Sequence, residues 1–301
     1  MNWTASDIPD QSGRKIIVTG ANSGIGYEAA LALAKKGAAV VLACRNLDKA
    51  GQARDRILQQ APDSVLDIMP LDLGKLASVN SFAEQFCSGH TTLDLLIANA
   101  GVMMPPQRQT TADGFELQFG TNHLGHFALV GQLLPLLMAT PASRVVVVAS
   151  SAHRWADIDI DDLDWQRRRY KKMPSYGQSK LANLLYTYEL QRRLTAAKEQ
   201  TIATAAHPGW TATNLQRHSG LFERLNPFFA MPAWQGALPS LYAATDPRLS
   251  GGEYIGPDGF MEMRGYPEVV SSNAASRDTE LAQSLWQASE QMTGVEYPLT
   301  A

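Results

Sequence analysis

The stretch KIIVTGANSGIGYEAA (15–30) decides the fold. Its first residues are an apolar run that predicts a buried strand, and its last residues begin a helical pattern that Gly37 closes. Three glycines, Gly20, Gly24 and Gly26, fall where the strand turns sharply into the helix. Such a turn needs conformational freedom at Gly20, and bare glycines let a pyrophosphate approach the N–H groups of the helix N-terminus. The alternative is a tight strand–helix turn that binds no ligand.

The same alternation of short apolar runs and longer helical patterns continues along the chain. Continuous apolar runs are typical of parallel strands buried on both faces and joined by helical crossovers. The expected strands are residues 15–20, 38–44, 65–73, 93–101, 144–150, 201–209 and 253–259, the last as a final edge strand. The expected helices are residues 24–36, 49–60, 77–86, 115–138, 175–195 and 234–245. No repeat or linker divides the chain, so we expect one doubly wound α/β domain over residues 1–301.

The composition is that of an ordinary globular protein, with 45% hydrophobic and 18% charged residues among 301. A net charge of -3 gives no support for nucleic-acid binding. The two cysteines, Cys44 and Cys87, form no paired motif, which fits a reducing compartment. No apolar run reaches the roughly 18 residues of a membrane span, and residues 1–15 contain no secretory signal. We therefore expect a cytoplasmic protein without an integral membrane segment.

A second pattern lies in PSYGQSKLAN (174–183), where Tyr176 and Lys180 stand four residues apart. On a helix both side chains share one face. A free tyrosine is a poor base at neutral pH, but a neighbouring ammonium stabilises its phenolate. The pair is therefore either a catalytic phenol with its activating lysine or an ordinary exposed pair.

The GxxxGxG spacing of residues 20–26, followed downstream by this Tyr–Lys pair, resembles the short-chain dehydrogenase/reductase family. The resemblance covers nearly the whole chain. The other matching motifs come in the family's order: Asp72 in LDL, ANAG (98–101), Asn122 in TNHLGHF, Ser150 in VVVVAS and PGWTAT (208–213). Further stretches look most similar to the branch of retinol dehydrogenases and protochlorophyllide reductases: ACRN (43–46), NHLGHF (122–127), the extended segment 151–175 and YGQSKLAN. The implied fold is a Rossmann sheet with helices on both faces.

The resemblance implies a catalytic tetrad of Asn122, Ser150, Tyr176 and Lys180. It also implies that a nicotinamide cofactor is held by the glycine turn, by the ends of the following strands, by the tetrad and by the Pro-Gly segment. The residues concerned are Thr19, Gly20, Asn22, Ser23, Gly24, Ile25, Gly26, Arg45, Asn46, Asp72, Leu73, Asn99, Ala100, Gly101, Tyr176, Lys180, Pro208, Gly209, Thr211 and Thr213.

The end of the second expected strand bears on the phosphate state of the cofactor. NAD-specific sites usually place an acid there, which binds the ribose 2′-hydroxyl and repels a 2′-phosphate. This chain has Cys44 at that place, followed by Arg45, and Asp48 comes three residues later. A guanidinium can pair bidentately with a phosphate. We therefore expect NADP(H) rather than NAD(H), unless Arg45 is only a solvated residue at a strand end.

The expected reaction is the reversible reduction of an apolar aldehyde or ketone. Tyr176 would donate a proton to the carbonyl oxygen while hydride arrives at carbon, and Ser150 would hydrogen-bond the same oxygen. Ser150 ends its strand and fits the family position better than Ser151. Lys180 would lower the pKa of Tyr176 and, by resemblance, hold the nicotinamide ribose, while Asn122 would hold a water for proton relay. The alternatives are reduction of a C=C bond on the same scaffold and a non-catalytic NADP-binding sensor.

For several polar residues the sequence indicates structural roles. His123 and His126 are not accompanied by acids or cysteines, so we expect packing or hydrogen bonding and no metal. His153 either borders the substrate pocket or is an ordinary loop histidine. The acidic run DIDIDDLD (157–164) could pair locally with the basic run QRRRYKK (166–172).

The aromatic-rich residues 210–235 directly follow the Pro-Gly segment. The family places a mobile lid over the substrate here, and exposed apolar side chains in a short irregular segment are otherwise unusual. The alternative is a contact with another subunit or with a membrane surface. The family also commonly forms homodimers or homotetramers through the helices that carry Asn122 and Tyr176, so we expect a homo-oligomer.

Overall fold

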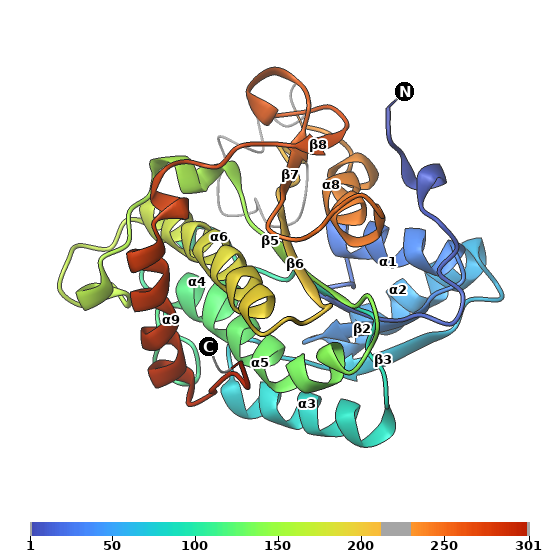
Figure 1. The fold of residues 1–301 in the computed structure, drawn as a ribbon, viewed down its shortest axis with the longest axis horizontal. Helices are drawn as coiled ribbons and strands as arrows, with labels where there is room; N and C mark the ends of the chain where they lie inside the picture. The colour runs from blue at the N-terminus through green and yellow to red at the C-terminus, as the bar shows by residue number, and fades with distance from the viewer. Residues whose placement is uncertain (1, 212–229, 300–301) are drawn as a thin grey trace.

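The computed structural model describes residues 2–211 and 230–299. These residues form one sheet in the order β3-β2-β1-β4-β5-β6-β7-β8 (Figure 1). Every neighbouring pair is parallel except β7 and β8, which are antiparallel. The strands are β1 Lys15–Thr19, β2 Ala39–Cys44, β3 Leu66–Pro70, β4 Leu95–Ala98, β5 Arg144–Val148, β6 Ile202–Ala206, β7 Tyr254–Pro257 and β8 Pro267–Val269.

Helices cover both faces of this sheet, which confirms the doubly wound α/β prediction. Helices α1, α2 and α8 share one apolar core with the sheet, and α3, α5 and α6 share the other (Figure 1). The helices are α1 Gly24–Lys35, α2 Leu47–Gln60, α3 Leu76–Gly89, α4 Leu117–Phe119, α5 Gly125–Met138, α6 Lys172–Ala196, α8 Ala233–Thr245 and α9 Thr279–Thr293. Among the described residues, none of the helices combines the length and apolarity that crossing a bilayer would require.

The strand order reverses between β1 and β4, which are neighbours in the sheet. In open sheets of this kind, ligands bind at the carboxyl ends of the strands where the order reverses. Gly20 directly follows β1, and residues 99–101 directly follow β4. The fold therefore brings the glycine turn and the ANAG motif to one place.

Two segments differ from the sequence-based expectation. Residues 253–259 contain β7, but β7 is not the edge, because β8 pairs with it on its outer side. Strand β8 has only three residues, too few to produce a recognisable pattern. The expected helix 115–138 is interrupted by a π-helical turn, Gly120–Leu124. The backbone is tight here, since a Cβ on Gly125 would lie 2.3 Å from the carbonyl oxygen of Leu73.

The segment between β5 and α6 is ordered by local contacts. It contains 3₁₀ turns at Ser151–Trp155 and Ile160–Asp162. The carboxylate of Asp162 accepts the backbone N–H groups of residues 166–168 at 2.7 to 3.1 Å. It also forms an ion pair with Arg168 at 3.5 Å. The expected pairing between the acidic and basic runs is confirmed at this contact.

Helix α9 was not anticipated from the sequence, and it packs against α6 and α5 (Figure 1). Trp286 of α9 is buried, stacks on Tyr186 of α6 and contacts the ring of Phe127 of α5 edge-on. Asp278 caps its first turn, and Gly294 ends it with a positive φ of 67°. The helix therefore covers part of the face that the family resemblance assigns to subunit contacts.

Candidate active site

The turn after β1 is shaped to let a ligand reach its backbone. Gly20 and Gly24 have positive φ angles of 69° and 57°, which suit glycine. A Cβ on Gly26 would lie 2.5 Å from the Gly20 carbonyl oxygen and 2.5 Å from Nδ2 of Asn99. Ser23 occupies the N-cap of α1, but its side chain makes no capping hydrogen bond. The first N–H groups of α1 are thus not capped by Ser23, and an anion suits that position.

Hydrogen bonds join this turn to the end of β4. The Thr19 hydroxyl accepts the N–H groups of Asn99 and Ala100, both at 2.9 Å, and Nδ2 of Asn99 donates to the Thr19 carbonyl at 2.8 Å. His126 supports the junction: its Nδ1 donates to the Asn122 carbonyl at 3.1 Å, so its Nε2 accepts the Thr19 hydroxyl at 2.9 Å. Burial lowers the pKa of His126 to about 4 and keeps it neutral. The structural role expected for this histidine is confirmed.

The end of β2 carries no acidic side chain. Cys44 is buried there, and burial raises the pKa of its thiol to about 11, although hydrogen bonds from the Ala21 and Asn22 backbone act in the opposite direction. The next residue, Arg45, is exposed. Asn46 caps the N-terminus of α2 with its side-chain oxygen. A neutral thiol followed by a solvent-facing guanidinium therefore adjoins the glycine turn.

The residues expected after β3 have different roles in the structure. Oδ1 of Asp72 accepts the N–H of Gly74 at 3.0 Å. Leu73 is buried, and its backbone contacts Gly125. Leu73 therefore contributes packing, whereas Asp72 is partly exposed.

Tyr176 and Lys180 lie in α6 and share one face, as their spacing predicts. The Ser150 side chain lies close enough to the Tyr176 hydroxyl to act on its pKa, which it lowers. Nζ of Lys180 lies 5.8 Å from the centre of the Tyr176 ring and donates to the Val148 carbonyl at 2.8 Å. Ser150 therefore faces the phenol from the end of β5, where its hydroxyl also accepts the Ala152 N–H at 3.2 Å.

Burial sets the protonation of this pair. Removal from water raises the pKa of Tyr176 to about 12, and Ser150 only partly opposes this rise. Burial also lowers the pKa of Lys180 to about 8. Burial therefore sets the pKa of Tyr176 above its ordinary value in this structure. The lowering of this pKa by Lys180 stays a prediction.

Asn122 lies inside the π-helical turn, and its side chain acts as a clamp. Its Oδ1 accepts the Val102 N–H at 2.8 Å, and its Nδ2 donates to the Val102 carbonyl at 3.0 Å and to the Ser179 hydroxyl at 2.9 Å. Ser179 in turn donates to the Tyr176 carbonyl at 2.8 Å. A Cβ on Gly101 would lie 3.1 Å from Oδ1 of Asn122. The turn thus fixes the strand end after β4 against the helix that carries the phenol.

The Pro-Gly segment follows β6 and reaches the edge of the described residues. Gly209 has a positive φ of 62°. The Thr211 hydroxyl donates to the Pro208 carbonyl at 2.7 Å. Thr213 and residues 212–229 of the expected lid lie outside the described residues.

Some neighbours of the site gave no signal in the sequence. Met104 and Ala152 pack with Tyr176 in a small apolar cluster, and Met103 lies against it. His153 is buried, and its Nδ1 donates to the Ser150 carbonyl at 2.7 Å. It therefore supports the serine segment. Its place after Ser150 was the only clue, while the two methionines lie in an irregular segment where no periodicity could have identified them.

The other histidine of the expected structural pair, His123, is also part of the core. Its Nε2 lies 2.9 Å from the Ser289 hydroxyl, and burial lowers its pKa to about 3. The described residues contain no group of three histidine, cysteine, aspartate or glutamate side chains that could hold a metal ion.

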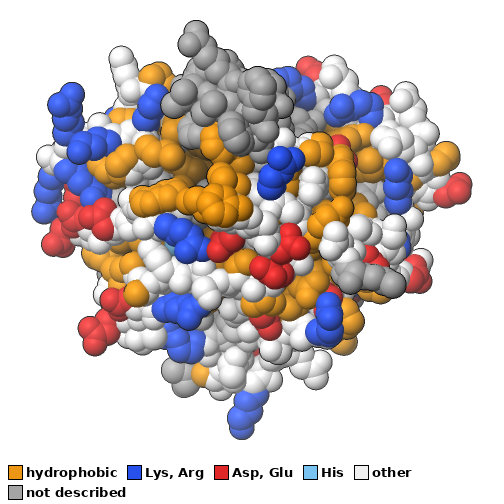
Figure 2. Space-filling model, turned by 90° about the horizontal axis from the view of Figure 1, so that it is seen from above, with side chains coloured by type: hydrophobic (Ala, Val, Ile, Leu, Met, Phe, Trp, Pro, Cys, Tyr) orange, Lys and Arg blue, Asp and Glu red, His pale blue; other side chains and the backbone are white. Residues whose placement is uncertain are grey.

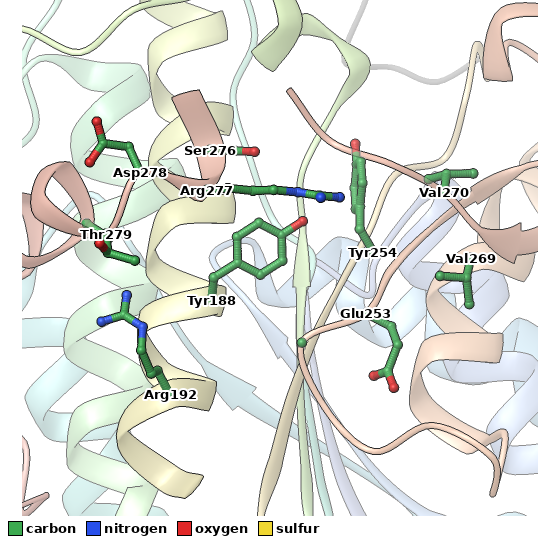
Figure 3. Close-up of a pocket in the computed structure, with 12 residues that line it drawn as sticks. Tyr188, Arg192, Glu253, Tyr254, Val269, Val270, Ser276, Arg277, Asp278 and Thr279 are labelled. Atoms are coloured by element: carbon green, nitrogen blue, oxygen red, sulfur yellow. The ribbon is translucent and has the colours of Figure 1, made fainter. Parts of the chain in front are cut away.

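A separate hollow of about 370 Å³ opens between α6, β7 and the start of α9 (Figure 3). Tyr188 of α6 points toward Tyr254 across it, and Arg192 and Glu253 also line it (Figure 3). None of the sequence-predicted site residues lines this hollow. The ring of Tyr254 also contacts His153, so this tyrosine forms the wall between the hollow and the serine segment.

The chain is similar to known proteins over most of its length. The family model described as short chain dehydrogenase matches residues 14–223. The chain is 40% identical over 297 residues to human retinol dehydrogenase 13, covering 95% of this chain and 86% of that protein. It is 40% identical over 291 residues to mouse retinol dehydrogenase 12, with 95% and 88% covered.

Solved structures give the same result. A crystal structure of an uncharacterised protein from Mycobacterium paratuberculosis superposes with a TM-score of 0.85 at 42% identity and covers 99% of this chain and 100% of that one. A short chain dehydrogenase from Shigella flexneri, solved with NADP, has a TM-score of 0.66 at 22% identity over 82% of this chain and 98% of that one, which shows the fold alone. The fold of this chain, the extent of its family match and its relatives agree. Together they show that the chain is an oxidoreductase that belongs to the short-chain dehydrogenase family.

Proposed function

We propose that this oxidoreductase uses NADP(H) to reduce an apolar aldehyde or ketone to the alcohol, reversibly. The observation that carries the proposal is the placement of Tyr176 beside the buried Lys180, 5.8 Å from its Nζ to the ring centre, with Ser150 near the Tyr176 hydroxyl at the end of β5. Two hydroxyls that meet at the carboxyl end of β5 can both hydrogen-bond one carbonyl oxygen. This is the arrangement that proton donation to a developing alkoxide needs.

The residues around the glycine turn fit a dinucleotide. The turn leaves no space for a Cβ at Gly26, and the N-terminus of α1 is not capped by Ser23. The pyrophosphate would be held at this helix end, and the ribose near Lys180. The adenine would lie near Asp72, with the nicotinamide along the Pro-Gly segment at Gly209. When bound, the cofactor supplies the hydride.

The chain's own residues would manage the proton. A pKa of about 12 keeps Tyr176 protonated at neutral pH, so it is available as the acid in the reducing direction. Ser150 would stabilise negative charge on the substrate oxygen, and the Lys180 ammonium would stabilise the phenolate left on Tyr176. The side chain of Asn122 is committed to Val102 and Ser179, so a proton relay through this residue would use its main-chain carbonyl.

The preference for NADP(H) follows from the charge at the end of β2. Cys44 remains a neutral thiol there and does not repel a 2′-phosphate. The exposed Arg45 can turn its guanidinium toward that phosphate without breaking an ion pair among the described residues.

The apolar nature of the substrate is inferred from the surroundings of the phenol. Met103, Met104 and Ala152 pack at Tyr176 and give the phenol an apolar side. The relatives named as retinol dehydrogenases bear the name of an apolar alcohol.

The test follows NADPH and NADH consumption over a panel of apolar aldehydes and ketones, including an α,β-unsaturated aldehyde. We expect turnover with NADPH and an unsaturated alcohol as product; a saturated aldehyde would indicate C=C reduction instead. Tyr176→Phe should lower kcat by about 10²- to 10⁴-fold. The matched control is Tyr188→Phe on the same helix, which should leave kcat unchanged. Undiminished turnover in Tyr176→Phe would refute the mechanism.

The cofactor preference has its own test. Arg45→Ala should raise the KM for NADPH by about 10-fold and leave the KM for NADH unchanged, because only NADPH carries the 2′-phosphate. Since Arg45 is exposed, the substitution should not disturb folding. A wild-type enzyme that works better with NADH contradicts the proposed role of Arg45.

A further inference from the structure

The loop between β7 and β8, residues 258–266, is tied to two segments of the active site. Oε1 of Glu262 accepts Nη2 of Arg154 at 2.6 Å, and its Oε2 lies 3.0 Å from Nε2 of His207. Arg154 belongs to the 3₁₀ turn that follows Ser150, and His207 directly precedes the Pro-Gly segment. One carboxylate thus joins the serine turn to the segment proposed to hold the nicotinamide.

His207 also contacts the Pro-Gly segment itself, because its Nδ1 accepts the Gly209 N–H at 3.3 Å. The loop also contacts the Pro-Gly segment through its backbone: the Trp210 N–H donates to the Met263 carbonyl at 2.7 Å. A Cβ on Gly209 would lie 2.6 Å from that same carbonyl oxygen. The loop and the Pro-Gly segment are therefore packed in direct contact.

The loop backbone is strained at its tip. Met261 and Glu262 have positive φ angles of 52° and 55°, a region that side chains with a Cβ rarely adopt. Such conformations persist where surrounding contacts hold them, and the contacts of Glu262 with Arg154 and His207 do so here.

This conformation leaves large apolar side chains in solvent. Phe260 is 79% exposed and Met261 is 65% exposed. Trp155, the residue after Arg154, is 71% exposed and lies on the other segment that Glu262 holds. Hydrophobic side chains gather on the face from which the loop projects (Figure 2). An exposed hydrophobic patch of this kind is typical of a binding surface.

We propose that residues 258–266 form a specificity-determining wall of the active site. Glu262 positions this wall, and Phe260 and Met261, together with Trp155, contact the apolar part of the substrate. The inference rests on the proposed reduction of an apolar carbonyl. The loop is connected to the surroundings of Tyr176 by the Glu262–Arg154 ion pair, because Arg154 lies in the turn that starts at Ser150. These side chains would thus contact the far part of a long substrate and leave a short one untouched.

The first experiment compares propanal with decanal, using NADPH and the full chain. In the double variant Phe260→Ser, Met261→Ser the KM for decanal should rise by about 10-fold with kcat preserved, as expected when an apolar substrate loses contacts. The KM for propanal should stay within about twofold of the wild-type value. The matched control is Val65→Ser, which replaces a side chain that is also 65% exposed but precedes β3. It should change neither KM.

The second experiment tests the positioning role of Glu262 without relying on turnover. Trypsin can cleave after the exposed Arg264 inside the loop. Glu262→Ala should speed this cleavage by about 10-fold, because the loop then opens more often. Arg154→Met should have a similar effect, and Glu262→Gln should restore part of the protection through its remaining hydrogen bond. Both Glu262 variants should raise the KM for decanal more than they lower kcat.

The two experiments separate failure of the inference from failure of the proposed function. If the wild-type enzyme reduces no aldehyde but Glu262→Ala speeds the cleavage, Glu262 still positions the loop and the proposed substrate class is wrong. Cleavage at the wild-type rate overturns the positioning role. Equal changes in KM for propanal and decanal, or none, overturn the specificity role. A double variant with unchanged kinetics whose mass by light scattering falls from oligomer to monomer identifies the surface as a subunit contact and also overturns it.

Discussion

Lys180 is a buried ammonium whose nearest polar partner is a carbonyl, and this makes its effect on stability measurable. Its side chain is almost fully buried, and no ion pair among the described residues neutralises it. Burial lowers its pKa from 10.5 to about 8. The folded protein therefore carries this charge at a cost at neutral pH. Replacing Lys180 by methionine should stabilise the fold while removing the proposed activity.

The magnitude follows from the shift. A pKa about 2.5 below the ordinary value corresponds to about 3 kcal/mol at pH 7, where both states are protonated. The lost hydrogen bond to the Val148 carbonyl reduces this gain by about 1 kcal/mol at most, because Nδ2 of Asn183 still donates to the same oxygen at 3.1 Å. We expect Lys180→Met to be more stable than the wild type by about 2 to 3 kcal/mol at pH 7.

The pH dependence gives the decisive signature. Between about pH 8 and 10.5 the unfolded wild-type protein binds more protons at this lysine than the folded protein does, so wild-type stability rises with pH there. The advantage of Lys180→Met should therefore shrink by about 2 kcal/mol between pH 7 and pH 9.5. Guanidinium unfolding followed by tryptophan fluorescence measures both values.

The matched control is Lys172→Met, an exposed lysine at the start of the same helix. Its stability should change by less than about 0.5 kcal/mol at either pH. If the advantage of Lys180→Met is the same at pH 7 and pH 9.5, the buried-ammonium reasoning is wrong.

Three further predictions address the turn, the core and the inserted segment. Gly26→Ala should abolish the rise in melting temperature that NADPH causes, because the new Cβ would meet the Gly20 carbonyl at 2.5 Å. Gly51→Ala has nothing within 4 Å of the added Cβ, so it should keep that rise and increase the free energy of unfolding by about 0.5 to 1 kcal/mol. Equal responses of the two variants to NADPH would contradict cofactor binding at the glycine turn. Trp286→Ala should cost about 3 to 5 kcal/mol in urea unfolding, and a loss below about 1 kcal/mol would show that α9 is not part of the core. Asp162→Ala should cost about 2 kcal/mol or more, because three backbone N–H groups lose a charged acceptor, and an unchanged midpoint would refute this.

The proposed reaction gives the buried charge beside the phenol a chemical role. The desolvation of the ammonium is unfavourable, but in the proposed mechanism it would stabilise a phenolate without competition from water. The clamp formed by Asn122, Val102 and Ser179 fixes the backbone around this pair. In that mechanism the charge would already be in place when a proton has to move, at the expense of stability.

The sequence by itself determined the doubly wound sheet, the glycine turn and the shared face of Tyr176 and Lys180. These features depend on local rules: apolar runs form buried strands, glycine permits positive φ, and residues four apart meet on a helix. The order of the motifs was sufficient to indicate which strand ends meet. Nothing in that pattern required knowledge of distant contacts.

Only the tertiary structure decided the features that depend on neighbours far apart in the chain. The π-helical turn at Asn122 lies where Gly125 packs closely against the backbone after β3. The positions of β8 and α9 depend on the surfaces that they cover. The same holds for the pKa of Tyr176, because only the folded chain shows the burial that raises it to about 12. It also holds for Glu262, whose two partners lie 108 and 55 positions away in the sequence. Burial and long-range contacts are properties of the folded chain, and no local pattern encodes them.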